Sequence, residues 1–345
     1  MKAKRVLLVM LSIVMIFTLV ACGGGSGESE GDQNPTYDLK LNAQYAADYP
    51  DTISLERAAA TIAEKTNGAV NIKIYPSGPM GDYTQVYEEV MKGTIDMASI
   101  TIPSQFDERL EISIIPYLTT NYDEAKRVFS KGSFFYDTFA EINGDLGVQL
   151  LNIYMDGYMG IGAAKLDPAT VMDPTVKKDT LLRCPPLDLY VATAEGMGFR
   201  TTTIAYADLY PALQTGVADG WIGGAALINY TGFRDVIKYY VDNKYIHEVV
   251  GTIINKELFE GMPEEYQKII QETFAEEAIL IAEEREATDE KAMADLEAAG
   301  VNVIVPTQEE MDNMAGYFRE NLWPKFEEKF GKDIMDGLKA DASGN

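Results

Sequence analysis

The stretch YDLKLNAQYAADYPDTISLERAAATIAEKTNGAVNIKIYP, residues 37–76, decides the fold class. It begins with alternating apolar and polar side chains, which is typical of a half-buried strand. Residues 55–65 then carry apolar and alanine residues at helical spacing, and Gly68 ends that helix. A second alternating run, AVNIKIYP, leads into a Pro-Ser-Gly turn. Strand, helix and strand within so short a span predict a parallel α/β sheet.

The same alternation continues along the chain, and no short internal repeat is visible. The sequence predicts further strands over 95–103, 148–154 and 300–306, and further helices over 83–91, 123–129, 188–197 and from 308 onward. Residues 263–299 contain no glycine and no proline after the first residue, so they predict one long helix. This helix exceeds the width of a small domain, and its apolar positions are not a sustained heptad. We therefore expect it to brace two lobes.

The amino terminus, MKAKRVLLVMLSIVMIFTLVAC, has early cations before an apolar run that is too short to span a bilayer permanently. It predicts an export signal over 1–21. The sequence LVAC resembles the lipobox of bacterial lipoproteins, in which Cys22 receives lipid and becomes the first mature residue. The alternative is a simple secretory signal with an incidental cysteine. Residues 22–36 are rich in glycine and acidic residues and predict a flexible tether.

Cysteine count and net charge narrow the class of protein. The chain of 345 residues has only two cysteines, so if Cys22 carries lipid, Cys184 has no intramolecular partner. Because 46% of the residues are hydrophobic, burial alone can stabilise one or two cores. The formal net charge of -25 excludes nucleic acid as a partner.

The search for catalytic groups is mostly negative. The single histidine, His247, cannot build a histidine metal cluster, and no GxSxG, CxxC or phosphate-binding GxxxxGK[ST] string occurs. We therefore expect no enzyme, no metal and no cofactor. A hydrolase based on paired carboxylates stays open as a remote alternative, because 54 acidic residues give sequence proximity no power to identify such a pair.

The stretch from 177 to 224, KKDTLLRCPPLDLYVATAEGMGFRTTTIAYADLYPALQTGVADGWIGG, holds the main candidate site residue. Arg183 ends an apolar, strand-like run and stands before two prolines. In doubly wound sheets, ligands lie at the carboxyl ends of strands. A guanidinium in that position can hold a carboxylate through two parallel hydrogen bonds. The alternative is a surface arginine paired with one of the many carboxylates.

Several motifs in this chain resemble the binding proteins of tripartite ATP-independent periplasmic (TRAP) transporters of the DctP type. The matching residues are LRCP at 182–185, DLYPALQTGVADG at 208–220, EKTNGAVNIKIYPSGPMGD at 64–82 and KGTIDMA at 92–98. The motifs occur in the family's order, and the resemblance spans essentially all of the mature chain.

The resemblance implies a two-lobed α/β fold, like that of periplasmic binding proteins, with a ligand cleft between the lobes and a long helix bracing both. We expect lobe I over 37–156 with 249–285, lobe II over 157–248 with 286–335, and a frayed tail over 336–345. By analogy with the family, Arg183 clamps the carboxylate of a small organic acid.

Two departures from the family pattern bear on the ligand. Tyr158 stands in DGYM, where many members have an aromatic-arginine pair, and WIGG follows the Asp-Gly motif in place of Glu-Asn-Pro. Without the arginine of that pair a second cationic contact is missing, which weakens the case for a sialic acid or a simple C4-dicarboxylate. Trp221 offers an aromatic wall or packs in the lobe core, and Gly224 would let a ligand approach the backbone.

Topology suggests three more residues for the cleft. Tyr45 ends the first strand, Thr101 lies at the end of the third, and Tyr158 opens the second lobe; each faces ligand or serves packing. Cys184, next to Arg183, is read as a buried structural cysteine.

The sequence therefore predicts a solute-binding lipoprotein at the extracytoplasmic face of the cell envelope, anchored through Cys22. Its partners would be a small organic acid, the TRAP membrane subunits and the membrane. The alternative, from another class, is a ligand-binding sensor subunit that docks on a membrane signalling receptor.

Overall fold

The strand-helix-strand unit predicted from residues 37–76 is confirmed. The computed structural model describes residues 35–344, so the predicted signal, nearly all of the tether and Cys22 lie outside the described residues. β1 (Tyr37–Ala43) and β2 (Val70–Tyr75) pair in parallel and are joined by α1 (Pro50–Lys65). This helix begins earlier than predicted because Pro50 occupies its first turn, where a missing N–H is not needed.

The other elements alternate in the same manner. The strands are β3 (Met97–Ile100), β4 (Val148–Ala163), β5 (Leu181–Cys184), β6 (Arg200–Thr203), β7 (Gly220–Gly224), β8 (Tyr239–Asn255) and β9 (Asn302–Ile304). The α-helices are α2 (Tyr83–Met91), α3 (Tyr122–Phe129), α4 (Phe134–Asp145), α5 (Asp188–Gly196), α6 (Leu209–Thr215), α7 (Ala226–Ile228), α8 (Lys256–Glu260), α9 (Glu264–Ala298), α10 (Gln308–Asn321), α11 (Trp323–Phe330) and α12 (Lys332–Ser343). Three short turns are η1 (Glu108–Ile114), η2 (Tyr206–Asp208) and η3 (Asn229–Phe233). Within residues 35–344, no helix is both long enough and apolar enough to cross a membrane.

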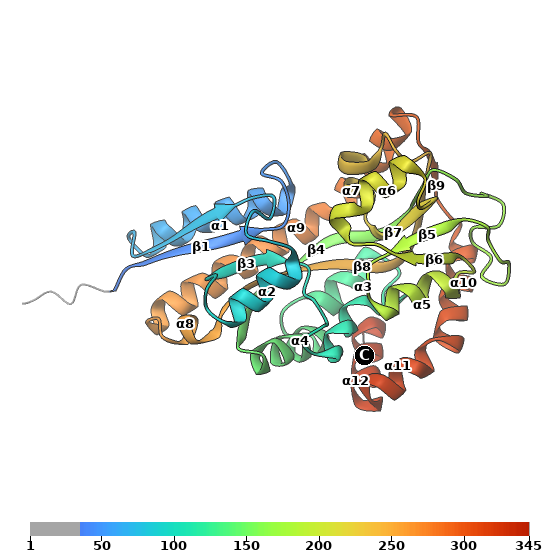
Figure 1. Cartoon of the computed structure of the whole chain (residues 1–345). Coiled ribbons are helices and arrows are strands. Elements are labelled where there is room, and N and C mark those ends of the chain that lie inside the picture. Colours follow the sequence, from blue (N-terminus) through green and yellow to red (C-terminus); the bar gives the residue numbers. More distant parts are fainter. Residues whose placement is uncertain (1–34, 345) are drawn as a thin grey trace, which may run out of the picture. The chain divides into compact units, whose positions relative to one another are not determined.

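The nine strands found within residues 35–344 form one mixed sheet. Its order is β2-β1-β3-β8-β4-β7-β5-β6, and β9 pairs with β8. The strands β1, β2 and β3 are parallel to one another, as are β5, β6 and β7. The first group lies with α1, α2 and α8 on one side of Figure 1, and the second lies with α5, α6 and α7 on the other. We call these two sides lobe I and lobe II.

Two long antiparallel strands, β4 and β8, belong to both lobes. Their pairing runs from Val148↔Asn255 in lobe I to Ala163↔Tyr239 in lobe II. The register shifts between Met155 and Tyr158, and such an irregularity bends a strand. The predicted lobe boundary at 156/157 falls within this shift, while both strands continue through it, so the division into residue ranges stays a prediction.

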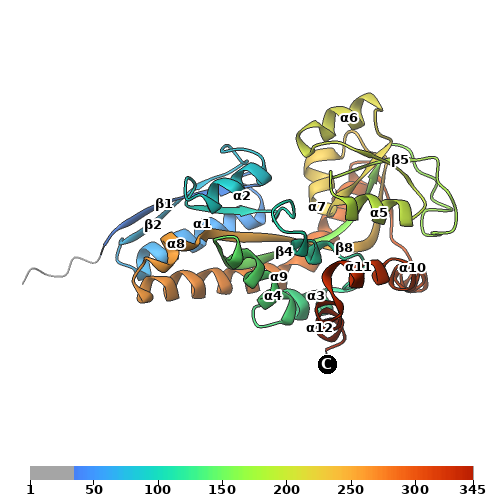
Figure 2. The same ribbon diagram turned by 60° about the horizontal axis from the view of Figure 1, so that its bottom comes forward.

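The predicted long helix is α9, and it contacts both lobes as expected. Ile270 and Phe274, in its first half, are buried in the core cluster around β1, β2 and α1. Ala292 and Leu296, in its second half, are buried in the cluster around α6, α7 and β7. Figures 1 and 2 show the helix running from the α8 side to the α7 side.

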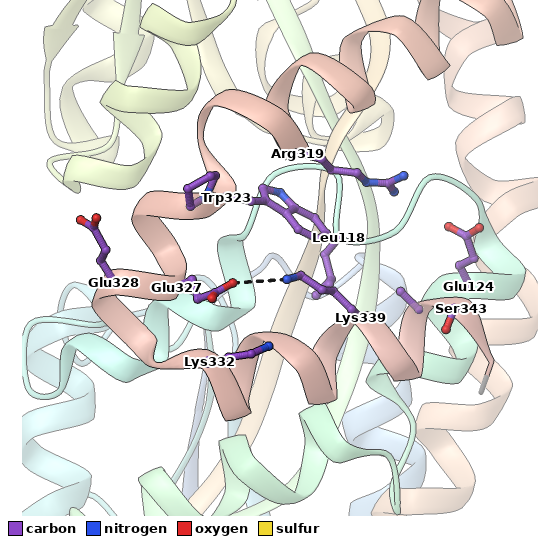
Figure 3. A pocket seen from close by; sticks show the side chains of 11 residues that line it. Leu118, Glu124, Arg319, Trp323, Glu327, Glu328, Lys332, Lys339 and Ser343 are labelled. Carbon is purple, nitrogen blue, oxygen red and sulfur yellow. Dashed lines mark ion pairs between the residues drawn. The ribbon is translucent and has the colours of Figure 1, made fainter.

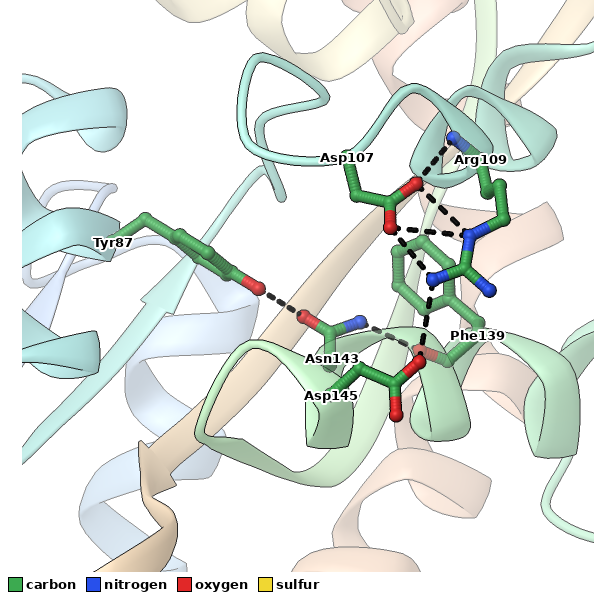
Figure 4. Close-up of polar contacts among 6 residues, drawn as sticks. All are labelled: Tyr87, Asp107, Arg109, Phe139, Asn143 and Asp145. Atoms are coloured by element: carbon green, nitrogen blue, oxygen red, sulfur yellow. Dashed lines mark hydrogen bonds and ion pairs between the residues drawn. The ribbon is translucent and has the colours of Figure 1, made fainter.

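Hydrogen bonds and ion pairs fix the segment after β3 to lobe I (Figure 4). Asp107 caps η1 and holds Arg109 with Nη2···Oδ2 at 2.7 Å, and Arg109 also reaches Asp145 at 3.3 Å. Beneath them, the Tyr87 hydroxyl donates to the buried amide of Asn143 at 2.7 Å. These contacts join α2, η1 and the end of α4 into one wall beside the sheet.

The carboxyl-terminal tail corrects the prediction of a frayed end over 336–345. Residues up to Ser343 form α12, and Met335 and Leu338 are fully buried. The Asp341 carboxylate accepts a hydrogen bond from the Phe135 N–H, which lies at the start of α4. The tail is ordered because its two apolar side chains complete the core beneath α3, α4 and α11.

Candidate ligand cavity

A cavity of about 390 Å³ lies between the two lobes. Lobe I contributes residues from the ends of β1 and β3 and from the start of α2, and lobe II contributes residues from β5, α5, η2 and β7. Most of these residues follow or end parallel strands, which is where open α/β sheets bind ligands. The wall includes Gln44, Tyr45, Tyr83, Thr101, Tyr190 and Tyr206.

Arg183 is the cation of this cavity, as predicted from its place at the end of a strand. It lies in β5, which pairs on one side with β6 and on the other with β7. Its side chain is only 2% exposed, and its Nε donates to the carbonyl of Ile204 at 2.7 Å. Within residues 35–344 no carboxylate forms an ion pair with it, which argues against the alternative of a surface arginine held by an acid. Burial lowers the pKa of this guanidinium, and the surrounding phenols partly oppose that shift.

Lobe I presents oriented polar groups to the same space. The Gln44 amide is clamped, because its Oε1 accepts from the Thr101 N–H at 2.9 Å and its Nε2 donates to the Thr101 hydroxyl at 3.2 Å. The Tyr45 hydroxyl donates to Asp156 Oδ2 at 2.6 Å. Thr101, Tyr45 and Arg183 are therefore the predicted site residues that the structure brings together.

Below the cavity, one guanidinium is shared by several buried acids. Arg285 of α9 lies 2.7 Å from Asp51 Oδ1 and 3.0 Å from Asp156 Oδ1. Tyr49 adds a hydrogen bond to Asp156 at 2.7 Å. Burial, reinforced by the charge of Asp156, raises the pKa of Asp51 to about 8, although Arg285 opposes the increase. This cluster joins α1, β4 and α9 where the lobes meet.

Glu248 of β8 is a cavity residue that sequence reasoning missed. Its side chain is 7% exposed, lines the cavity and leaves Oε2 without a hydrogen-bond partner. Burial raises its pKa well above the usual value. The sequence gives little signal for it, because the segment from Val241 to Ile254 mixes charged and apolar residues and does not show the alternation of a strand.

The structure places Tyr158, Trp221 and Gly224 away from the cavity wall, contrary to expectation. Tyr158 is 1% exposed, and its hydroxyl lies 2.8 Å from both the Thr119 hydroxyl and the Asn121 carbonyl. Trp221 is also 1% exposed and donates from Nε1 to Asn229 Oδ1 at 3.0 Å. Gly224 leaves space for that indole, because a Cβ at this position would lie 2.2 Å from the ring. Successive strand residues face opposite sides, so Gly223 reaches the wall and its neighbours do not.

Cys184 and His247 have structural surroundings. Cys184 is fully buried, and its Sγ lies 3.8 Å from the carbonyl of Tyr190. His247 is packed among the rings of Tyr122, Phe129 and Tyr158, and burial lowers its pKa to about 3. Among the described residues, no group of three or more His, Cys, Asp or Glu side chains is arranged to hold a metal ion.

A larger hollow of about 860 Å³ lies on the surface beside α10, α11 and α12 (Figure 3). Its cations already have partners: Lys339 lies 3.5 Å from Glu327, and Arg319 donates to the carbonyl of Tyr117 at 3.1 Å. It is open and carries both signs of charge, so the interlobe cavity with its unpaired guanidinium is the better ligand site.

A two-lobed α/β chain with a buried, unpaired cation in an interlobe cavity defines a protein that binds small ligands. The chain belongs to the bacterial extracellular solute-binding proteins of family 7 (DctP), whose family model matches residues 41–329. Family membership confirms the predicted class of solute-binding protein and places its work outside the cytoplasm.

Individual relatives are similar in sequence to this chain along most of its length. It is 23% identical over 309 residues to a solute-binding protein of Verminephrobacter eiseniae, covering 88% of each chain. It is 24% identical over 290 residues to the ectoine-binding periplasmic protein TeaA of Halomonas elongata, covering 80% of this chain and 82% of TeaA. A TRAP periplasmic solute binding protein from Desulfovibrio salexigens, solved with bound orotic acid, has a TM-score of 0.80 at 23% identity and covers 89% of this chain and 99% of its own. The structural likeness confirms the predicted two-lobed fold.

Proposed function

We propose that this chain captures a small organic acid in the interlobe cavity and delivers it to a TRAP-type transporter in the membrane. The observation that carries the proposal is Arg183, a cation 2% exposed on the cavity wall with no acidic partner among residues 35–344. A buried charge without a partner is costly, so a site of this kind is completed by an anion from outside the chain.

The geometry of Arg183 suits a carboxylate. Its Nε is occupied by the Ile204 carbonyl, which fixes the plane of the guanidinium, and the terminal nitrogens form no hydrogen bond within residues 35–344. Two parallel N–H groups match the two oxygens of a carboxylate. The Desulfovibrio salexigens relative, solved with orotic acid as its ligand, supports an acid as the class of solute.

The test compares Arg183→Ala and Arg183→Lys with Arg200→Ala. Arg200 lies in the neighbouring strand β6 and is exposed, so it is the matched control. Calorimetric titration with organic acids should show tight binding by wild type and by Arg200→Ala. Arg183→Ala should lose about 2–5 kcal/mol of binding free energy. Arg183→Lys should lose less because it keeps the positive charge, but it lacks the two parallel N–H groups of a guanidinium and should still bind more weakly than wild type. Equal binding by all four proteins would contradict the proposal.

We also propose that the chain is held at the membrane by a lipid on Cys22. Support comes from the sequence Leu19-Val20-Ala21-Cys22 after an apolar run, with the predicted tether behind it. In a bacterial host, wild type should take up labelled palmitate and sediment with membranes, whereas Cys22→Ala should do neither. Membrane association of Cys22→Ala equal to wild type would contradict lipidation.

The alternative of a sensor subunit finds no support among these relatives. The relatives named above bear solute-binding names, and the solved structure is that of a TRAP protein. The family is one of binding proteins for transport, so the expectation that the chain is no enzyme agrees with its class.

A further inference from the structure

We propose that the solute carries a cationic nitrogen besides its carboxylate, and that Glu248 receives that nitrogen. The inference rests on the proposed function, because it assigns the second end of a ligand whose first end Arg183 holds. The class of solute is therefore a small zwitterion, such as an amino acid with its amine separated from the carboxylate.

The first support is the place of Glu248. It lines the same cavity as Arg183, is 7% exposed, and has an Oε2 without a donor. Tyr190 and Tyr206 line the same cavity as these two residues. A single small molecule in a cavity of about 390 Å³ can therefore reach both charges.

The second support is the balance of charge beneath the cavity. No cation forms an ion pair with Glu248 among residues 35–344, and Arg285, whose charge acts on Glu248, already pairs with Asp51 and Asp156. Buried acids thus outnumber buried cations at this end of the site. A positive group from the ligand would supply the missing charge, whereas a second anionic group would add to the repulsion.

The groups around Glu248 determine how tightly its carboxyl holds a proton in the empty site. Burial raises its pKa most, Asp156 and Asp51 add to the increase, and Arg285 opposes it. The phenols of Tyr190, Tyr206 and Tyr245, on α5, η2 and its own strand β8, lie within range of its charge. Glu248 therefore holds its proton more tightly in the empty site than a free carboxyl does. A bound cation favours its carboxylate, so the proton leaves to solvent and affinity rises with pH.

The experiment uses the mature protein freed of ligand by unfolding and refolding, with isothermal titration calorimetry. The probes are β-alanine, γ-aminobutyrate and δ-aminovalerate, each beside the hydroxy acid of the same length. We expect at least one amino acid to bind tenfold or more tightly than its hydroxy partner. Its affinity should rise up to tenfold per pH unit while Glu248 titrates, with about one proton released.

Two variants locate the effect. Glu248→Gln should lose the tenfold preference while retaining the hydroxy acid, and Asp48→Asn, which changes an exposed acid that does not line the cavity, should keep it. If amino acids bind no better than hydroxy acids, or if affinity falls with rising pH in wild type, the inference is overturned. A panel in which no amino acid binds also overturns it. Carboxylate binding that depends on Arg183 would still uphold the proposed function in each case, and loss of that dependence would remove both.

Discussion

At the scale of single residues, the most informative side chain is that of Arg183, which has few polar partners within the protein. Arg183 is buried, yet it makes one hydrogen bond to a carbonyl and no ion pair within the described chain. Burying a charge without a counter-ion destabilises the folded state. Arg183 therefore favours binding of an anionic ligand but lowers the stability of the ligand-free protein.

A first prediction follows from this conflict. Arg183→Met should leave the ligand-free protein as stable as wild type or more stable by about 1–2 kcal/mol, because an apolar side chain of similar length replaces a buried charge. Urea unfolding of both ligand-free proteins measures the difference. A loss of more than about 2 kcal/mol would instead assign Arg183 a structural role.

The second prediction concerns Gly224, which lies against the indole of Trp221. An added Cβ would lie 2.2 Å from the ring, so Gly224→Ala should cost about 2–3 kcal/mol through overpacking. Gly232→Ala is the control, because a Cβ there meets nothing within 4 Å. Thermal melts should separate the two variants, and equal melting temperatures would show that Trp221 is not packed against Gly224.

Residue-level sequence reasoning succeeded where a backbone signal fixed the position. Arg183 ends an apolar run before prolines, so its place at a strand terminus could be predicted. Gly224 could not be separated from Gly223, because a shift by one residue in a strand moves a side chain to the other face. An indole suits both predicted roles of Trp221, an aromatic wall of the cavity and a place in the lobe core. Its packing against Phe233 and its hydrogen bond to Asn229 place it in the core.

At the scale of elements, α12 is the part that the sequence described least well. Its sequence, KDIMDGLKADAS, is polar except for a few positions, and a glycine in its middle weakens helix propensity. The helix exists because tertiary burial of Met335 and Leu338 outweighs that weakness. Polar composition alone therefore misled the prediction of a frayed end.

The third prediction tests this helix. Leu338→Ala should lower the free energy of unfolding by about 2–5 kcal/mol, since its side chain is fully buried. Asp336→Ala, on the exposed face of the same helix, should change it by no more than about 0.5 kcal/mol. Urea unfolding of the three proteins gives the comparison. If Leu338→Ala were as stable as wild type, the tail would be frayed after all.

The long strands β4 and β8 show a different limit of sequence reasoning. Both are buried along nearly their whole length, so they lack the alternation that marks a half-exposed strand. Only the first part of β4 was predicted, and β8 was not, which is why Glu248 went unnoticed. By contrast, β1, β2 and α9 have one buried face or a clear helical composition, and their bounds were close to those observed.

At the scale of the whole molecule, acidic excess has two separate consequences. The net charge of -25 over the full chain favours solubility at the surface. Inside, Asp51 of α1 and Asp156 of β4 pair with the guanidinium of Arg285 in α9, and the charge of Arg285 also acts on Asp289. Burial raises the pKa of Asp51 to about 8 and that of Asp289 to about 7, in each case against the opposing effect of Arg285.

The fourth prediction is that the ligand-free protein loses stability as the pH rises from 6.5 to 8. An acid whose pKa is raised by folding binds more protons in the folded state, so its stabilising effect is complete below the unfolded pKa and is lost as the pH passes through the folded pKa. For Asp51 alone the loss over this interval is about 2 kcal/mol. His247 acts in the opposite sense, but its depressed pKa contributes mainly below 6.5.

A variant that tests the same effect at a second acid is Asp289→Asn, which keeps an acceptor for the Tyr122 hydroxyl but removes one buried titration. Its unfolding free energy, measured by urea titration from pH 5 to 8, should fall less steeply than that of wild type, chiefly below pH 7 where Asp289 titrates. Asp48→Asn removes an exposed acid and should follow the wild-type curve. Parallel curves for all three proteins would mean that the cluster around Arg285 keeps its acids ionised throughout. In that case the guanidinium of Arg285 would stabilise the charge of further acids besides Asp51 and Asp156, with which it forms ion pairs.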